Sequence, residues 1–129
     1  MVYTFTTAIN DIGELGKAIF QINTLGGAIA DPARYPLSAY PHRDYPYLGE
    51  LQNYWDTDAQ TDGRVAAVNR VQEKLHASGI RKHYRNYPSA ELPDWADAYY
   101  GQEVYAGLQQ CKAVYDPANR IAHAQSVRV

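Results

Sequence analysis

The sequence is poor in cross-linking residues and has no long apolar run. Its 129 residues contain a single cysteine, Cys111, which excludes an internal disulfide and leaves too few thiolates for structural zinc. The net charge of −2, with basic residues scattered, gives no electrostatic footprint for nucleic acid or an acidic membrane. No segment approaches the roughly 20 apolar residues of a membrane span, and nothing near Met1 resembles a signal peptide. We therefore expect one soluble, cytoplasmic domain that binds neither nucleic acid nor a membrane.

The sequence also lacks the short motifs of common cofactor sites and catalytic centres. Its four histidines fall in different predicted elements and form neither HxH nor HExxH, so we predict no metal site. The LGG at residues 25–27 belongs to neither GxGxxG nor GxxxxGK. GxSxG is absent, as is a Cys/His pair at a diagnostic spacing. These absences argue against a metal site, a dinucleotide-binding fingerprint and a hydrolase.

Tyrosine, by contrast, is abundant where phenylalanine is scarce. The chain has twelve Tyr and two Phe. Four of these tyrosines lie in HYRNYPSAELPDWADAYYG, residues 83–101. A buried Tyr needs a hydrogen-bond partner for its hydroxyl, so Tyr is harder to bury than Phe. The phenols of this stretch therefore either line something polar or pack a core at extra cost.

Four stretches have the composition of β-strands. They alternate with Gly-, Pro- and Asn-containing segments, and three prolines predict a loop over residues 31–41. Alternation within the third stretch places Tyr47 and Trp55 on one face, with Glu50 and Tyr54 on the other. The predicted strands are residues 2–8, 22–30, 45–55 and 81–87.

Apolar residues at helical spacing predict three helices. The first begins at an N-cap at Asn10 or Asp11, extends to about residue 22 and is weakened by two glycines. The second runs over about 64–77 and ends at Gly79. Its apolar stripe consists of Val65, Val68, Val71 (or Gln72) and Leu75.

The third helix begins after Asp94, is interrupted at Gly101 and reaches about Tyr115. A turn at 115–119 and an extended or irregular tail follow. The order β-α-β-β-α-β-α predicts an α+β fold. We expect an antiparallel sheet of about four strands with helices packed on one face.

The motif YRNY, residues 84–87, is the strongest candidate for chemistry. If it is extended, Arg85 and Tyr87 share one strand face. A guanidinium near a phenol favours the phenolate and lowers its pKa from about 10, so Tyr87 could act as a general base near neutral pH. A cross-strand aromatic ladder with Asn86 in a turn explains the same residues without chemistry, as a surface turn with paired charges explains PHRD at 41–44. Spacing alone leaves these interpretations open.

Several stretches, in the same order from about residue 19 to the end, resemble one known family. They are LGGAIA, AYPHRD followed by tyrosines, YRNYPSAEL, DWADAYYG and CKAVYDPANRIAHAQSV. Together they resemble the C-terminal part of the berberine bridge enzyme-like family of FAD-linked oxidases. The chain departs from the family at Ser89 and Glu91, where Asp is usual, and at Ile121, where Phe is expected.

The resemblance implies a substrate-binding domain whose antiparallel sheet, flanked by helices, covers a flavin ring. It implies that Tyr87 is the base that deprotonates a substrate hydroxyl, before hydride passes to the flavin and oxygen reoxidises it. The spacing of YRNY keeps Arg85 beside Tyr87 as a catalytic candidate. The resemblance also implies that cofactor contacts come from Asn86, Tyr84 and Asn119. From the same resemblance we expect substrate contacts from His42, Arg43, Tyr47 and Trp55.

The resemblance does not extend to an FAD-binding domain, so we expect FAD to reach this chain only through a partner domain or chain. Three hypotheses follow: a subunit or portion of a split flavin oxidase, a flavin-less cyclase or isomerase, or a small-molecule binding module. Exposed sheet edges need covering, and the stretch 2–8 carries no charge or proline to blunt one. We therefore expect a homodimer or a hetero-complex with a flavin-binding chain.

Overall fold

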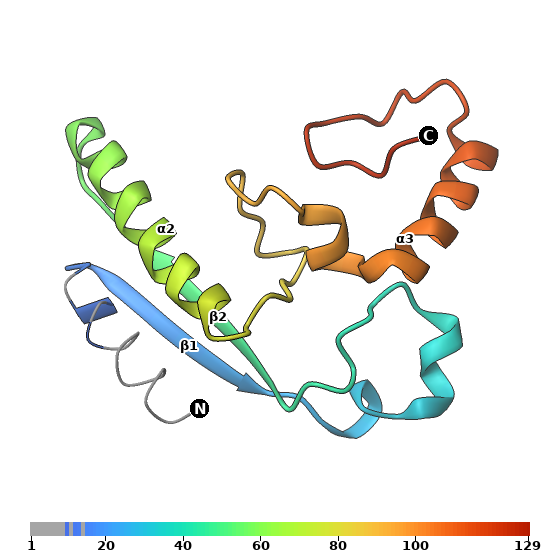
Figure 1. The fold of residues 1–129 in the computed structure, drawn as a ribbon, viewed down its shortest axis with the longest axis horizontal. Coiled ribbons are helices and arrows are strands. Elements are labelled where there is room, and N and C mark those ends of the chain that lie inside the picture. The colour runs from blue at the N-terminus through green and yellow to red at the C-terminus, as the bar shows by residue number, and fades with distance from the viewer. Residues whose placement is uncertain (1–9, 11, 14) are drawn as a thin grey trace. The chain divides into compact units, whose positions relative to one another are not determined.

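The computed structural model describes residues 10, 12–13 and 15–129 of the chain, and Figure 1 shows its ribbon. The chain divides into two compact units. The first comprises Met1–Asn23 and Tyr47–Arg81, and the second comprises Thr24–Pro46 and Lys82–Val129. Each unit therefore joins two stretches that are distant in the sequence.

A two-stranded antiparallel sheet forms the base of the first unit. Its strands are β1 (Ala18–Thr24) and β2 (Tyr47–Asn53). Just beyond one end of the pair, the Tyr54 N–H donates to the Lys17 carbonyl at 2.9 Å. The position of β2 confirms the strand predicted over 45–55. Its alternation is confirmed too, because hydrogen bonds join the side chains of Tyr54, Gln52 and Glu50 on one face.

Helix α2 (Thr61–Ala77) packs its apolar stripe against this sheet (Figure 1). Val71 is 1% exposed and lies at the centre of a core that includes Phe20 of β1 and Leu51 of β2. The helix predicted over 64–77 is confirmed. Val65, however, is 38% exposed and does not belong to the buried part of the stripe.

A glycine with a left-handed backbone conformation ends α2, and another glycine lies inside the same helix. Replacing each with alanine gives a matched pair of variants. Gly79 has φ 91°, so Gly79→Ala should lower the free energy of unfolding by about 1–2 kcal/mol. Gly63 lies inside α2, and a Cβ added there would have no atom of another element within 4 Å, so Gly63→Ala should raise stability by about 0.5–1 kcal/mol. Urea unfolding followed by helical circular dichroism measures both, and equal effects of one sign would contradict this assignment of the helix end.

The second unit is built around α3 (Trp95–Tyr115). Gly101 has φ 69° and ψ 166°, so two helical segments meet there at a kink, as the sequence predicted. The core beside the kink contains Leu92, Trp95, Ala98 and Tyr99. The loop that was predicted over 31–41 contains a 3-10 helix (Pro32–Leu37), whose cap Asp31 accepts a hydrogen bond from the Ala33 N–H at 3.0 Å.

The helix predicted from Asn10 or Asp11 to about residue 22 is right only at its start. Gly13 is the last described helical residue of this region, and β1 begins at Ala18. Ala18 and Phe20 pack toward α2 while Ile19 is 53% exposed, a period of two that belongs to a strand. Pairing with β2 therefore outweighs the near-helical spacing, as tertiary contacts commonly do for β-forming residues.

Two further strand predictions need correction. The strand predicted over 22–30 is right only at its start, because β1 ends at Thr24 and a 3-10 helix (Gly27–Ile29) follows. The strand predicted over 81–87 is wrong, because residues 84–87 form a turn. The strand predicted over 2–8 lies outside the described residues. The α+β class is confirmed, and the sheet of the described residues has two strands rather than four.

Candidate functional site

Five rings of the second unit form one group, which we call the aromatic cluster: Tyr40, His42, Tyr45, Tyr84 and Tyr87. The Tyr40 ring meets those of His42 and Tyr84 edge to face, with ring centres 5.5 and 5.8 Å apart. The Tyr84 and Tyr87 rings meet in the same way at 5.2 Å. Edge-to-face contacts of this kind stabilise aromatic groups beyond their buried area. The structure therefore brings together the PHRD and YRNY motifs.

His42 lies inside the cluster rather than at its surface. Its side chain belongs to a residue that is 8% exposed, and Nε2 lies 2.8 Å from the His83 carbonyl oxygen. A carbonyl only accepts, so Nε2 carries the proton. Burial lowers the pKa of His42, and the carbonyls of His83 and Tyr99 offset this in part, while the charge of Lys82 lowers the pKa further. His42 is therefore a neutral, buried hydrogen-bond donor. Its predicted contact with substrate stays a prediction.

Arg43 covers the outer side of the cluster. Its guanidinium carbon lies 5.5 Å from the Tyr40 ring centre and 5.9 Å from that of Tyr35, and Nη1 donates to the Ile29 carbonyl at 2.8 Å. The Tyr35 hydroxyl donates to Asp44 at 2.6 Å, and this bond raises the pKa of Tyr35. Arg43 thus holds the 3-10 segments of the loop against the cluster through cation–π contacts.

The YRNY turn presents Tyr87 at the edge of the cluster. The Tyr87 N–H donates to the Tyr84 carbonyl at 2.9 Å, and Asn86 Nδ2 donates to the Tyr84 hydroxyl oxygen at 2.8 Å. Tyr87 is 36% exposed, so part of its ring reaches solvent. The hydrogen bond from the Asn86 amide holds the Tyr84 phenol in place. Tyr87 is the more accessible of the two tyrosines of the motif.

Arg85 does not share a strand face with Tyr87, because the motif is a turn and not a strand. Its guanidinium carbon lies 5.6 Å from the Tyr99 ring centre, and Nη2 lies 3.2 Å from His123 Nε2. The geometry assumed for the effect of Arg85 on Tyr87 is therefore wrong. The catalytic role of Arg85 itself stays a prediction.

Tyr99 ties the YRNY segment and the tail to α3. It is 1% exposed, and its hydroxyl accepts from the Ser89 N–H and donates to Gln125 Oε1, both at 3.1 Å. Gln125 Nε2 in turn donates to the Ser89 carbonyl at 2.7 Å. The sequence left open whether Tyr99 packs a core or lines something polar, and it did not point to Gln125. The signal that could have found Gln125 is the QS pair at the end of the tail motif.

The turn at 115–119 is held by one carboxylate. Asp116 accepts from the backbone N–H groups of Arg120 at 2.7 Å and Ile121 at 3.0 Å, and pairs with Lys112 at 3.1 Å. Asn119 adopts φ 49°, a left-handed conformation that Asn tolerates better than most residues. The predicted turn is confirmed, and Asn119 serves it through its backbone conformation. A contact of Asn119 with a cofactor stays a prediction.

Acid should loosen this turn. The Arg120 N–H has the largest effect on the pKa of Asp116. Together with Ile121 and Lys112 it holds this pKa below the ordinary value of an Asp carboxyl, although burial acts in the opposite direction. A lowered folded-state pKa stabilises the fold above the unfolded value, and this contribution is lost as pH falls through the folded pKa. We expect faster hydrogen exchange at Arg120 and Ile121 as pH falls from about 5 to 2, after correction for intrinsic rates. Asp116→Asn should abolish this pH dependence, whereas the control Asp58→Asn should keep it.

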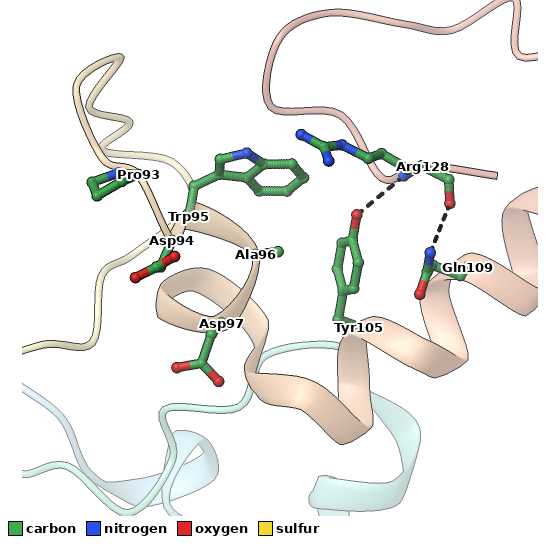
Figure 2. A pocket seen from close by; sticks show the side chains of 8 residues that line it. All are labelled: Pro93, Asp94, Trp95, Ala96, Asp97, Tyr105, Gln109 and Arg128. Atoms are coloured by element: carbon green, nitrogen blue, oxygen red, sulfur yellow. Dashed lines mark hydrogen bonds between the residues drawn. The ribbon is translucent and has the colours of Figure 1, made fainter.

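A separate hollow of about 540 Å³ lies between the first turn of α3 and the tail (Figure 2). Trp95 and Tyr105 come from opposite sides of the Gly101 kink and meet edge to face at 5.7 Å. The Arg128 guanidinium lies 5.7 Å from the Trp95 ring centre, and the Arg128 N–H donates to the Tyr105 hydroxyl at 3.2 Å. None of the described residues predicted for the site lines this hollow.

Two of the predicted site residues belong to the first unit. Tyr47, in β2, is 62% exposed, and Trp55, two residues beyond that strand, is 39% exposed. Their predicted contacts with substrate stay predictions. Across residues 10, 12–13 and 15–129, no group of three or more His, Cys, Asp or Glu side chains could hold a metal ion. The helices in this part of the chain are also too short or too polar to cross a membrane.

The described residues suit one part of an FAD molecule and not another. The rings of the aromatic cluster and the Asn86 amide suit a flat ring system with polar edges. A pyrophosphate, however, is bound by free N–H groups at a helix start or in a Gly-rich loop. The first turns of α2 and α3 carry Asp62 and Asp97, whose charges disfavour a phosphate there. The first turns of α2 and α3 are therefore unsuited to hold the pyrophosphate of FAD.

Comparison with known proteins finds a family model and several curated relatives that this chain resembles. Residues 83–128 match the family model described as berberine and berberine like. The chain is 31% identical over 113 residues to an uncharacterised FAD-linked oxidoreductase, YvdP, of Bacillus subtilis, covering 86% of this chain and 24% of that protein. It is 33% identical over 101 residues to a carbohydrate oxidase of Microdochium nivale, covering 70% of this chain and 19% of that protein.

A second FAD-linked oxidoreductase of Bacillus subtilis, YgaK, is 28% identical over 103 residues, which cover 80% of this chain and 22% of that protein. The chain thus spans less than a quarter of the length of these curated relatives. No solved structure matches it at a comparable level of significance. The resemblance to the C-terminal region of berberine bridge enzyme-like oxidoreductases is confirmed.

Proposed function

From the berberine-like segment at residues 83–128, we propose that this chain supplies the substrate-side part of an FAD-linked oxidase, with Tyr87 as its general base. The flavin would be held by another domain or chain. The relatives named as FAD-linked oxidoreductases and as a carbohydrate oxidase support a substrate that carries a hydroxyl group, such as a sugar. Natural products with a hydroxyl or an amine are the other substrates that we consider.

The observation that carries this proposal is the position of Tyr87. Its phenol lies at the accessible edge of the aromatic cluster, on a turn that Asn86 and Tyr84 hold by a side-chain hydrogen bond. A base must be fixed in place and still reach the proton that it removes. Within the YRNY motif, Tyr87 is the tyrosine that is both held by a turn and accessible. Arg85, Asn86, Tyr84 and Asn119 stay in the proposal as neighbours of the base and of the flavin.

The residues of this chain would accept a proton from the substrate and orient the substrate. Tyr87 Oη would accept the proton of a substrate hydroxyl, while the rings of the cluster exclude water from one side of the substrate. Arg43 would shape the substrate side of the aromatic cluster. The chemistry that FAD supplies when bound is the acceptance of a hydride. This division fits the aromatic and amide groups that the described part of the second unit offers.

We propose that the flavin-binding part covers apolar surface that the described chain leaves exposed. Val114 and Tyr115 at the end of α3 are 71% and 83% exposed, and Ile121 beyond the turn is 75% exposed. Lys112 and Asp116 hold the Ile121 backbone close to the end of α3. Clusters of exposed apolar groups mark interaction surfaces. A homodimer that covers the same residues is the other arrangement.

The visible absorption spectrum after gel filtration tests the proposal. The purified chain mixed with FAD should elute without flavin bands, and a flavin-carrying partner, where supplied, should co-elute with it and become reducible by substrate. A colourless homodimer that converts or binds a ligand without flavin would instead favour the cyclase, isomerase or binding-module alternatives. Flavin bound tightly by the chain alone would overturn the proposed division of labour.

A further inference from the structure

We infer that His42 is a positioning residue that holds the YRNY turn, and with it Tyr87, through its hydrogen bond to the His83 carbonyl. The inference rests on the proposed role of Tyr87 and adds a residue that acts on it through His83, which lies 41 residues after His42 in the sequence. His42 does not contact substrate in this inference. This positioning role replaces the substrate contact that the sequence analysis expected for His42.

The backbone of His83 is held by two hydrogen bonds, one at each of its polar groups. Its carbonyl accepts from His42 Nε2 at 2.8 Å, and its N–H donates to the Ala98 carbonyl of α3 at 2.9 Å. The turn begins at the next residue, Tyr84, so these two bonds fix the position from which the turn starts. Without the His42 bond, a part-buried carbonyl would lose this donor, which is more costly than the same loss at a fully exposed carbonyl.

The ring contacts provide a second line of support, independent of that hydrogen bond. Tyr40 lies edge to face against both His42 and Tyr84, and Tyr84 lies edge to face against Tyr87. A continuous row of packed rings therefore leads from His42 to the proposed base. Cores of close-packed side chains transmit small displacements because they contain little free space.

The protonation state of His42 agrees with this role. The groups that face it are the Tyr40 and Tyr45 rings of its own loop, the charge of Lys82, and the carbonyls of His83 and Tyr99. Burial and Lys82 favour the neutral ring, and the carbonyl at Nε2 selects the tautomer that donates to His83. A neutral donor is suited to holding a backbone carbonyl within an aromatic environment.

Hydrogen exchange of the 129-residue chain tests the inference without any flavin. In His42→Phe, which keeps a ring and removes the donor, the His83 and Tyr87 amides should exchange about fivefold faster, the loss expected for one hydrogen bond. His42→Gln places an amide N–H near the position of Nε2 and should restore most of the protection. Should His42→Phe fail to fold, His42→Asn, whose shorter amide does not reach His83, gives the same comparison with His42→Gln. Unchanged exchange in the variants without a donor would overturn the inference.

A double-mutant cycle in the flavin-loaded oxidase tests whether His42 acts through Tyr87. His42→Phe should slow flavin reduction by about tenfold in the wild-type background and leave it almost unchanged in a Tyr87→Phe background, because coupled residues are non-additive. Full additivity would show that His42 does not act through Tyr87 and would overturn the inference. Failure of the proposed function has a different signature, a Tyr87→Phe enzyme that reduces its flavin at the normal rate.

Discussion

Replacing Tyr87 with Phe should lower the rate of substrate oxidation by about 10²- to 10⁴-fold, the usual contribution of a positioned general base. The substitution removes one hydroxyl and keeps the ring that packs edge to face on Tyr84. The turn is closed by backbone groups of Tyr84 and Tyr87, so its geometry should survive. The measurement is the rate of flavin reduction under anaerobic conditions, in the oxidase that contains this chain. Reoxidation by oxygen should be unchanged, because it follows the proton transfer.

Two further phenols provide the controls for this prediction. Tyr54 is 52% exposed in the first unit, and Tyr54→Phe should leave flavin reduction at the wild-type rate. Tyr84→Phe removes the acceptor of the Asn86 amide and should produce a smaller loss than Tyr87→Phe, because it disturbs the turn without removing the base. A Tyr87→Phe enzyme as fast as Tyr54→Phe would exclude Tyr87 as the base.

The sequence predicted α2 and α3 well because helical periodicity and glycine both act over a few residues. Gly79 and Gly101, with φ of 91° and 69°, are where the sequence placed an end and an interruption. The region of β1 satisfied two patterns at once, since its isoleucines fit a helical spacing and its β-branched composition fits a strand. Only the partner strand β2 decides between them, and that partner begins 23 residues after β1 ends. Local patterns carry no information about such a pairing.

The sequence predicted which residues belong to the candidate site better than it predicted how they are arranged. YRNY was identified correctly as unusual, but the assumption of a strand placed Arg85 beside Tyr87, whereas the turn places it against Tyr99 and His123. Asn86 decides this locally, because its amide bonds the Tyr84 hydroxyl and favours the turn. His42 contacts His83 only after the chain has closed a long loop. Its burial could therefore not be inferred from the polar appearance of PHRD.

Replacing Tyr99 with Ala should destabilise the second unit by about 3–5 kcal/mol, the usual loss for a large aromatic side chain in a core. The residue is 1% exposed, packs beside Trp95 and supports both Ser89 and Gln125 through its hydroxyl. Tyr99→Phe removes only the hydroxyl and leaves the Ser89 N–H without this acceptor, which should cost about 1–3 kcal/mol. The difference between the two variants separates the packing of the ring from its hydrogen bonds.

Urea unfolding read by Trp95 measures this loss in the correct unit. The chain has two tryptophans, and Trp55→Phe removes the one in the first unit, so the remaining fluorescence comes from beside Tyr99. Tyr115→Ala is the matched control and should change the free energy of unfolding by no more than about 0.5 kcal/mol, as expected for an exposed side chain. If Tyr99→Ala were as stable as this control, the tail and the YRNY segment could not depend on Tyr99. Because Tyr99 lies under Arg85 and bonds Ser89, its loss should also loosen the turn that presents Tyr87, so hydrogen exchange at Tyr87 should rise in Tyr99→Ala and not in Tyr115→Ala.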